Sequence, residues 1–127
     1  MLKSLTVVLE DRQGALAGAC EVIGQAGVNI EGMCCFASQG VAMLYVAVAD
    51  GAGARRSLER HGLKVSEERD VVAVPVEDQP GGAGRVLRRI ADAGLNLEVA
   101  YQALGHRIVV GVRDLEKLQA VLSSARG

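Results

Sequence analysis

The pattern of apolar and polar positions along this chain predicts a strand, a helix and a hairpin in its first third. An apolar, β-branched stretch at 4–10 predicts a strand, and the polar residues 11–14 after it predict a loop. Apolar residues then recur at helical spacing, and Gly27 suits the left-handed backbone that ends a helix. The residues with this spacing are Leu16, Ala19, Cys20, Ile23 and Ala26.

Residues 30–68 complete a first unit. A strand starts at 30, the turn "SQG" follows at 38–40, and a second apolar strand covers 41–49. A short helix holding Leu58 and a last strand at 62–68 give the order β-α-β-β-α-β. The strand at 41–49 does not alternate, which is typical of burial on both faces, and helices cover only one face of such a sheet. We therefore expect a second copy of the protein on the other face, forming a homodimer.

The second half of the chain repeats the first at an offset of 67 residues, without gaps. It predicts a strand at 71–76, a helix, strands near 95–103 and 106–112, and a last helix capped by Asp114. Nine identities support two copies of one supersecondary unit. The pairs are Val7/Val74, Glu10/Glu77, Asp11/Asp78, Gly14/Gly81, Ile23/Ile90, Ala26/Ala93, Gly27/Gly94, Asn29/Asn96 and Glu31/Glu98.

The pattern predicts an α+β fold of two ferredoxin-like βαββαβ modules with antiparallel sheets side by side, over residues 1–69 and 70–127. The residue matching Leu63 would be number 130, so we expect the second module to lack its fourth strand. The strand at 71–76 then lies on a sheet edge, where Pro75 is tolerated, although a bulge would explain the proline equally well. The open edge would pair with another copy or with another segment of this chain.

Composition narrows the classes of function. With 14 basic and 15 acidic residues, the chain has no net positive electrostatic field to attract nucleic acid. With one Phe, two Tyr and no Trp, it also has almost no aromatic surface on which bases could stack. The sequence shows no signal peptide and no membrane-spanning run, so we expect a soluble, cytoplasmic protein. Cys20, Cys34 and Cys35 indicate small core residues rather than a zinc site, and His61 and His106 are isolated, so we expect no metal and no cofactor.

Two motifs in register resemble the ACT domain, an amino-acid-sensing regulatory module of enzymes such as phosphoglycerate dehydrogenase and aspartate kinase. They are the loops "EDRQG" and "EDQPGG", each followed by a helix and by "AGVNI" or "AGLNL". The resemblance covers nearly the whole chain, as a tandem pair without a catalytic domain. It implies a free amino acid or a similar small effector bound between paired modules, and a biosynthetic enzyme or transcription regulator as the partner that receives the signal.

The resemblance also implies the ligand-binding residues, which lie in the loop after the first strand and at the asparagine before the second. Helix N-termini supply N–H groups for a carboxylate, and carboxylates and amides supply partners for an ammonium. The first loop lacks the proline that Pro80 provides in the second, so the two sites need not be equivalent. The candidates are Asp11, Arg12, Gln13, Gly14, Ala15, Asn29 and Ile30 in the first module and Asp78, Gln79, Pro80, Gly81, Gly82, Asn96 and Leu97 in the second.

Other interpretations of the same residues stay open. Asp11 and Asp78 would also serve as helix caps, and the asparagines as turn residues. A ligand-free structural dimerisation module is one alternative function. An acylphosphatase-like hydrolase, with Arg12 and Asn29 positioning a phosphate and a water, is another, but no nucleophile–base pair or carboxylate pair is apparent, so we expect no enzyme.

Overall fold

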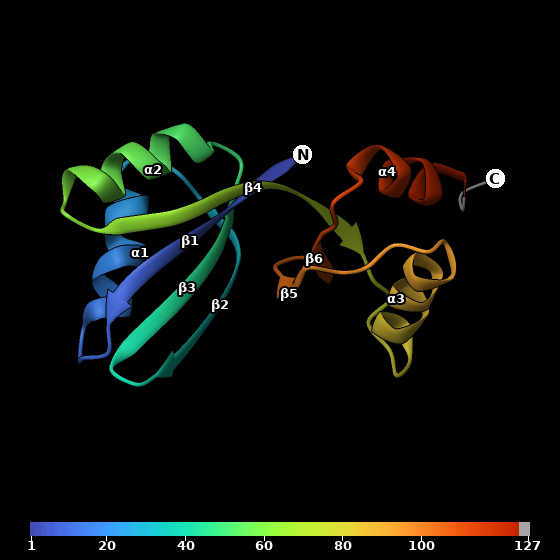
Figure 1. The fold of residues 1–127 in the computed structure, drawn as a ribbon, viewed down its shortest axis with the longest axis horizontal. Coiled ribbons are helices and arrows are strands. Elements are labelled where there is room, and N and C mark those ends of the chain that lie inside the picture. Colours follow the sequence, from blue (N-terminus) through green and yellow to red (C-terminus); the bar gives the residue numbers. More distant parts are fainter. Residues whose placement is uncertain (125–127) are drawn as a thin grey trace.

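The computed structural model describes residues 1–124, which form antiparallel strands and four helices (Figure 1). The elements follow the predicted order, and the expected α+β class is confirmed. Their bounds are β1 (Leu2–Glu10), α1 (Ala15–Gln25), β2 (Ile30–Ser38), β3 (Val41–Val48), α2 (Gly51–Arg60), β4 (Lys64–Pro75), α3 (Gly82–Asp92), β5 (Val99–Ala103), β6 (Arg107–Gly111) and α4 (Leu115–Ser124).

The first module has the strand order β4-β1-β3-β2 predicted for a split β-α-β unit. Every second residue of β1 and β3 points to the side of α1 and α2, since successive side chains of a strand point to opposite faces. Fully buried residues from the strands and helices form this core. They include Leu5, Ile23, Leu44, Val46 and Leu58.

The long strand β4 replaces the two separate strands that the sequence predicted at 62–68 and 71–76. Leu2 to Val8 of β1 pair with residues 64–71, whereas residues 72–75 pair with β6. The six strands close into one ring in the order β1-β3-β2-β5-β6-β4, where we expected two sheets side by side. The reason is that one uninterrupted backbone can pair with β1 on one edge and with β6 on the other. The ring closes through a single pair between β2 and β5, Gly32 opposite Ala103.

The second module consists of β6 and β5 beside the end of β4, with α3 and α4 on one face. Among residues 1–124 no fourth strand pairs with residues 72–75, so this part of β4 is an edge, as predicted. The ladder from Val72 to Pro75 has no register shift, and Pro75 therefore needs no bulge. The last three residues of the second module as we delimit it lie outside the described residues.

A third cluster of buried residues lies between the modules. Ala47 of β3 packs with Val71, Tyr101 and Val109, and the Tyr101 hydroxyl lies 2.8 Å from the Ser4 hydroxyl. Burial raises the pKa of Tyr101, so the phenol stays neutral. The second module thus covers part of the face of β3 that we expected a second copy of the protein to cover. Covering it with a segment of the same chain costs no association entropy.

The helix starts correct one prediction and confirm another. Asp11 and Asp78 do not cap α1 and α3, because the loops end in left-handed glycines, Gly14 (φ 82°) and Gly81 (φ 89°), which occupy the cap positions. Asp114 does cap α4, where its carboxylate accepts from the Lys117 N–H at 3.0 Å. Gly27 and Gly94 end α1 and α3 with φ of 77° and 80°, as predicted.

The cysteines are less buried than the sequence indicated. Cys35 packs against the core of the first module, but its neighbour Cys34 points to the other face and is exposed. Burial raises the pKa of both Cys20 and Cys35. Opposite orientations of Cys34 and Cys35 agree with their adjacent positions on one strand.

The β2–β5 junction predicts the effect of a substitution at Gly32. A Cβ atom there would lie 2.9 Å from the Cβ of Ala103 and 3.1 Å from the Gln102 carbonyl oxygen. We expect Gly32→Val to lower the free energy of unfolding by about 1–3 kcal/mol, measured by urea unfolding followed by circular dichroism. Gly24→Ala in α1, where nothing lies within 4 Å of the new atom, is the control and should stabilise by about 0.5–1 kcal/mol. Equal urea midpoints for Gly32→Val and the parent would refute the requirement for close approach.

Candidate functional site

An open hollow of about 610 Å³ lies within the second module, beside the β5–β6 turn that contacts the first module. Its walls are the connection from β4 to α3 and the β5–β6 turn. We call it the junction hollow, and it is lined by residues 76–80 and 102–108 together with Ala83.

The β4–α3 connection is shaped by short-range hydrogen bonds and glycines. Gln79 N donates to the Glu77 carbonyl oxygen at 2.9 Å, and Gly82 N donates to the Gln79 carbonyl oxygen at 3.0 Å. A Cβ at Gly82 would lie 2.1 Å from the Glu77 oxygen, so only glycine fits this turn. The "QPGG" sequence therefore fixes the wall of the hollow whether or not a ligand binds there.

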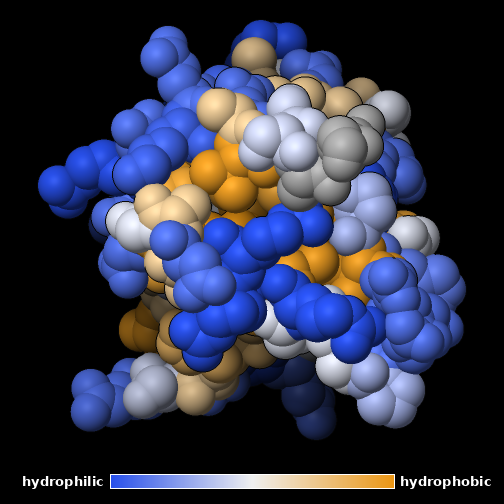
Figure 2. All heavy atoms as spheres, turned by 90° about the vertical axis from the view of Figure 1, so that its right-hand side faces the viewer, coloured by the Kyte–Doolittle hydropathy of each residue, from blue (hydrophilic) through white to orange (hydrophobic). Residues whose placement is uncertain are grey.

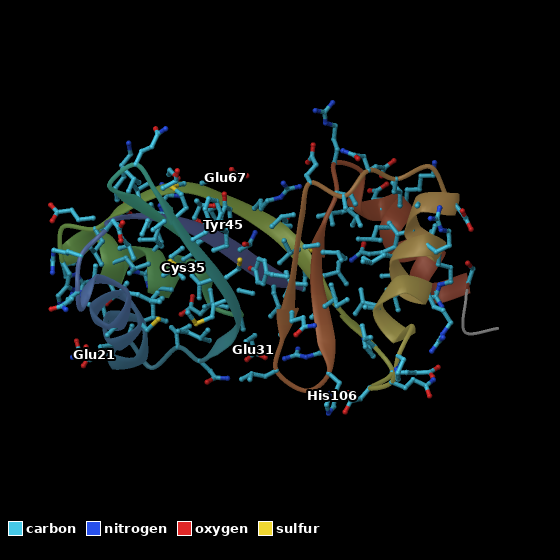
Figure 3. All side chains as sticks on the ribbon, turned by 90° about the horizontal axis from the view of Figure 1, so that it is seen from below. Glu21, Glu31, Cys35, Tyr45, Glu67 and His106 are labelled. Atoms are coloured by element: carbon cyan, nitrogen blue, oxygen red, sulfur yellow. The ribbon has the colours of Figure 1, made fainter. Side chains whose placement is uncertain are left out.

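The opposite wall is a tight hairpin turn with two left-handed residues, Gly105 (φ 73°) and His106 (φ 53°). It places His106 beside Asp78, with 3.7 Å between Nδ1 and Oδ2. Figure 3 shows His106 at the tip of this turn. The hollow therefore presents a carboxylate and an imidazole side by side.

Glu31 connects this wall to the first module. Its carboxylate accepts from Arg107 Nη2 at 3.0 Å and from Asn29 Nδ2 at 3.2 Å, while its backbone oxygen accepts from Leu104 N at 2.9 Å. The side-chain bonds from Arg107, first, and from Asn29 lower the pKa of Glu31 and keep it charged. The side chains of Glu31 and Arg107 are 25% and 27% exposed, so the ion pair is only partly hydrated. Asn29 is thereby linked to the junction hollow through two hydrogen bonds.

The first predicted loop lies elsewhere. Asp11 N donates to the Gly40 carbonyl oxygen at 3.2 Å, which places residues 11–14 beside the β2–β3 turn at the outer end of the first module (Figure 1). Arg12 pairs with Glu10 at 3.1 Å, both being exposed, and Ala15 packs against the core. Arg12 and Asn29 are at opposite ends of α1, so they do not form the joint phosphate site of a hydrolase.

The other candidates divide between hollow and core. Asp78, Gln79 and Pro80 line the junction hollow, and Gly81 and Gly82 shape it. Asn96 lines a separate hollow of about 410 Å³ with Glu98, Arg113 and Lys117. Ile30 and Leu97 pack against the two cores. The structure therefore places only one of the two loops at the hollow, and the asparagine of the other module is connected to it through Glu31 and Arg107.

Sequence reasoning missed three residues of this site: Glu31, His106 and Arg107. Glu31 is one of the nine positions that the repeat conserves within the chain, so the repeat contained a signal for it. His106 and Arg107 follow the turn glycine and have no identical counterpart at the offset of 67. Only the hairpin brings them over the hollow.

Among residues 1–124, no group of three or more potential ligands has a geometry suited to a metal ion. No described helix is long and apolar enough to cross a membrane.

Comparison with known proteins adds information on the fold. No family model matches the sequence, and a search of curated proteins found no match. The structure is similar to protein BT0572 from Bacteroides thetaiotaomicron, with a TM-score of 0.83 and 24% identity over 98% of this chain and 88% of that one. It is also similar to the regulatory subunit of aspartate kinase from Thermus thermophilus, with a TM-score of 0.75 and 17% identity over 98% and 90% of the two chains.

A whole aspartate kinase, from Synechocystis, matches 98% of this chain over 25% of its own length, with a TM-score of 0.70 and 18% identity. At these identities the similarity shows the fold alone. The chain therefore shares the fold of these proteins, which is the ACT-type fold that the sequence motifs resemble.

The Glu31 network predicts a pH dependence of stability. Because its pKa is lowered on folding, Glu31 stabilises the native state above the ordinary carboxyl value of about 4.3, and this contribution is lost as the pH falls through the lower folded value. We expect Glu31→Gln to be less stable than the parent near neutral pH, and the difference to close in acid. Urea unfolding of both proteins between about pH 3 and 7 measures it. A difference that stays constant over this range would contradict the assignment.

Proposed function

We propose that this protein is a non-enzymatic regulatory module that binds a free amino acid, or a similar small zwitterion, in the junction hollow. The observation that carries the proposal is the arrangement of polar groups on the two walls, with the Asp78 carboxylate on one and the His106 imidazole and the Arg107 guanidinium on the other. The volume of about 610 Å³ is ample for a single amino acid.

The residues of the hollow suit both charged groups of such an effector. The Asp78 carboxylate accepts hydrogen bonds from an ammonium, while His106 and the N–H groups at the start of α3 donate to a carboxylate. Charge-assisted hydrogen bonds contribute about 1.5–3 kcal/mol each, so two or three give micromolar to millimolar affinity after association costs.

Regulation follows from the β5–β6 turn, which lines the hollow and also joins the second module to the first. The β5–β6 turn that forms one wall also contacts the first module through Arg107 and Leu104, and β2 and β5 share only one residue pair. An effector that binds one arrangement of this turn better than another shifts the packing of the two modules, which we delimit at 1–69 and 70–127. The receiver is a biosynthetic enzyme or a transcription regulator, and the similarity to an enzyme's regulatory subunit supports the former.

We also assign the protein a homodimeric state. Part of the first module's sheet stays uncovered by the second module, with Phe36 53% and Val41 41% exposed. Phe36 stacks on Tyr45 with 6.0 Å between ring centroids, which forms a flat apolar surface. A second copy placed on this surface removes it from water.

Thermal unfolding against each of the twenty free amino acids at millimolar concentration tests the proposed function. A ligand at 100 times its dissociation constant adds about 2.7 kcal/mol, a rise of several degrees in a chain of this size. We expect one amino acid or a related group to raise the melting temperature. No rise with any of them would favour the alternative of a structural dimerisation module.

The same assay locates the site. We expect Asp78→Asn to abolish the rise, and Asp11→Asn, which makes the same change in the outer loop, to keep it. If Asp11→Asn abolished the rise and Asp78→Asn kept it, the effector would bind at the first loop and the assignment to the junction hollow would be wrong.

The dimer is tested separately by sedimentation velocity. Phe36→Glu puts a charge on the apolar surface and should give a monomer, whereas Leu16→Glu on α1, a residue 36% exposed on the helical side of the sheet, should leave the dimer intact. A parent protein that sediments as a monomer at micromolar concentration would rule the dimer out.

A further inference from the structure

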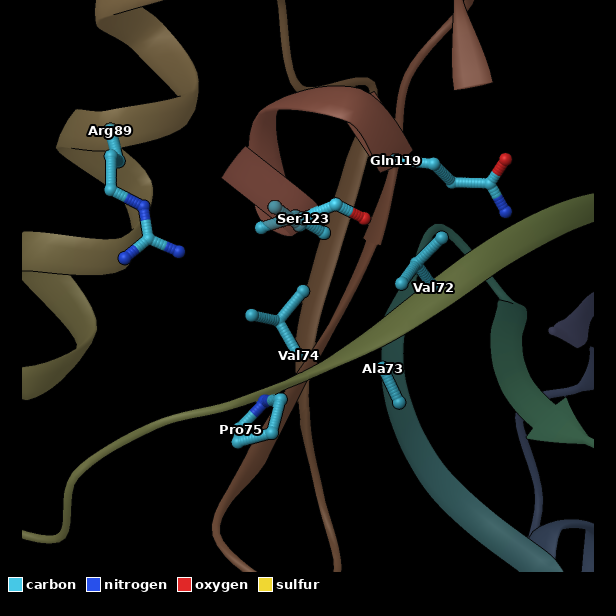
Figure 4. Close-up of a pocket in the computed structure, with 8 residues that line it drawn as sticks. Val72, Ala73, Val74, Pro75, Arg89, Gln119 and Ser123 are labelled. Atoms are coloured by element: carbon cyan, nitrogen blue, oxygen red, sulfur yellow. The ribbon is translucent and has the colours of Figure 1, made fainter. Parts of the chain in front are cut away.

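A second hollow, which takes no part in the proposed effector site, lies on the opposite side of β4 from β6. It is a groove of about 670 Å³ between α3 and α4, and its floor is the last part of β4. Figure 2 shows apolar residues exposed between polar rims at this end of the molecule. In Figure 4, Arg89 projects from α3 on one side, Gln119 and Ser123 lie on α4 on the other, and Val74 and Pro75 lie on β4 between them.

The backbone beside this groove has unpaired hydrogen-bonding groups. Val76 N donates to the His106 carbonyl oxygen at 2.8 Å, so residues 72, 74 and 76 direct their N–H and C=O groups to β6. Ala73 and Pro75 direct theirs to the other side, where the β1 ladder ends at Val71 opposite Leu2. This edge therefore offers the N–H and C=O of Ala73 and the C=O of Pro75. It can take a short strand through three hydrogen bonds.

The first module shows what fills the equivalent place. There, residues 64–71 of β4 pair with β1 and complete the sheet. Val65 of this segment is buried in the core, and three positions later the Glu68 carboxylate accepts from Arg55 of α2 at 3.2 Å. A strand with an apolar residue followed by an acidic one three positions later is thus the occupant that this fold uses.

The groove also has a cation, although from the other helix. Arg55 lies on α2, whose counterpart is α4, whereas Arg89 lines the groove from α3. No carboxylate lies within ion-pair distance of Arg89 among residues 1–124. The neighbouring Arg85 and Arg88 pair with Glu77 and Asp92 at 3.5 and 4.0 Å. Arg89 is therefore the arginine of α3 that has no acidic partner among residues 1–124, and a carboxylate from an incoming strand would supply one.

The geometry points to a docking site for a β-strand of a partner protein in the α3–α4 groove: an extended segment that pairs with Ala73 and Pro75, buries one apolar side chain beside Val74 and Leu122, and brings an Asp or Glu to Arg89. The strand acts as the missing fourth strand of the second module. This inference is independent of the effector site, which is formed by the β4–α3 connection and the β5–β6 turn and shares no lining residue with the groove.

A second copy of this chain offers less to the groove than such a partner. Each β4 edge has a single free N–H, that of Ala73, because Pro75 has none. Two edges paired with each other therefore form only two hydrogen bonds, and residues 72–75 bring no carboxylate to Arg89. The chemistry of the groove favours a different segment.

Fluorescence anisotropy with a labelled, end-capped peptide tests the site. The probe is GLKVSEERD, the sequence of residues 62–70, titrated with the full-length protein. We expect saturable binding. Ala73→Pro removes the free N–H but leaves the β6 ladder intact, and it should weaken binding about fivefold to tenfold.

Charge exchange gives a second readout that does not depend on the proline variant. Arg89→Glu should weaken binding of the probe, and a probe carrying Lys at the position of Glu68 should bind Arg89→Glu better than it binds the parent. Arg88→Glu, on the same helix with a side chain 76% exposed, is the matched control and should bind the original probe like the parent.

Three results would overturn the inference. The first is no binding at millimolar peptide by folded protein, and the second is binding that neither Ala73→Pro nor Arg89→Glu changes. The third is a dimer in sedimentation velocity that Ala73→Pro dissociates, which would show that a second copy occupies the edge. Peptide binding without any amino-acid effect on melting would uphold this site and reject the effector proposal.

Discussion

The whole arrangement depends on the continuous backbone of β4. Its first part completes the sheet of the first module, and its last four residues begin the second. Because it pairs with β1 on one edge and with β6 on the other, the second module must follow the first without a linker. The buried cluster of Ala47, Val71, Tyr101 and Val109 then forms between them, and the β5–β6 turn is brought to the start of β2.

This constraint makes two similar sequence copies unequal in the structure. In each module the helix separates the loop at its start from the asparagine beyond its end. Only one loop, that of Asp78, lines the junction hollow, and the opposite wall is the turn that Arg107 ties to Glu31 and thereby to Asn29. One feature of the repeat is nevertheless kept in both modules. Glu31 accepts from Arg107 at 3.0 Å, and its counterpart Glu98 accepts from Arg69 at 2.9 Å. Each glutamate is therefore bound by an arginine from outside its own helix–strand unit.

The two pairs of polar side chains near the junction differ in how far they are exposed to water. The Glu31–Arg107 pair is about three-quarters buried, and it fixes the turn that forms the wall of the hollow. The Asp78 and His106 side chains are 77% and 68% exposed, so both are in contact with water and neither is committed to the other. The Glu31–Arg107 pair thus supports the turn that carries His106, while Asp78 and His106 remain available to a ligand. The α3–α4 groove contains none of these four residues.

Much of this structure could be predicted from the sequence because its signals are local. The period of the apolar residues predicted the order of strands and helices, and glycines at 27 and 94 predicted the ends of α1 and α3. The fixed offset predicted that the order strand, helix, strand, strand, helix occurs twice. Pro75 correctly indicated an edge, since a residue without an N–H cannot serve a central strand. The fusion of two strands into β4, the closure at Gly32 and Ala103, and the meeting of Glu31, Arg107 and Asp78 depended on contacts between residues up to 76 positions apart. Such contacts leave no periodic trace in a single sequence, because they are selected by packing and backbone pairing only after the local elements exist.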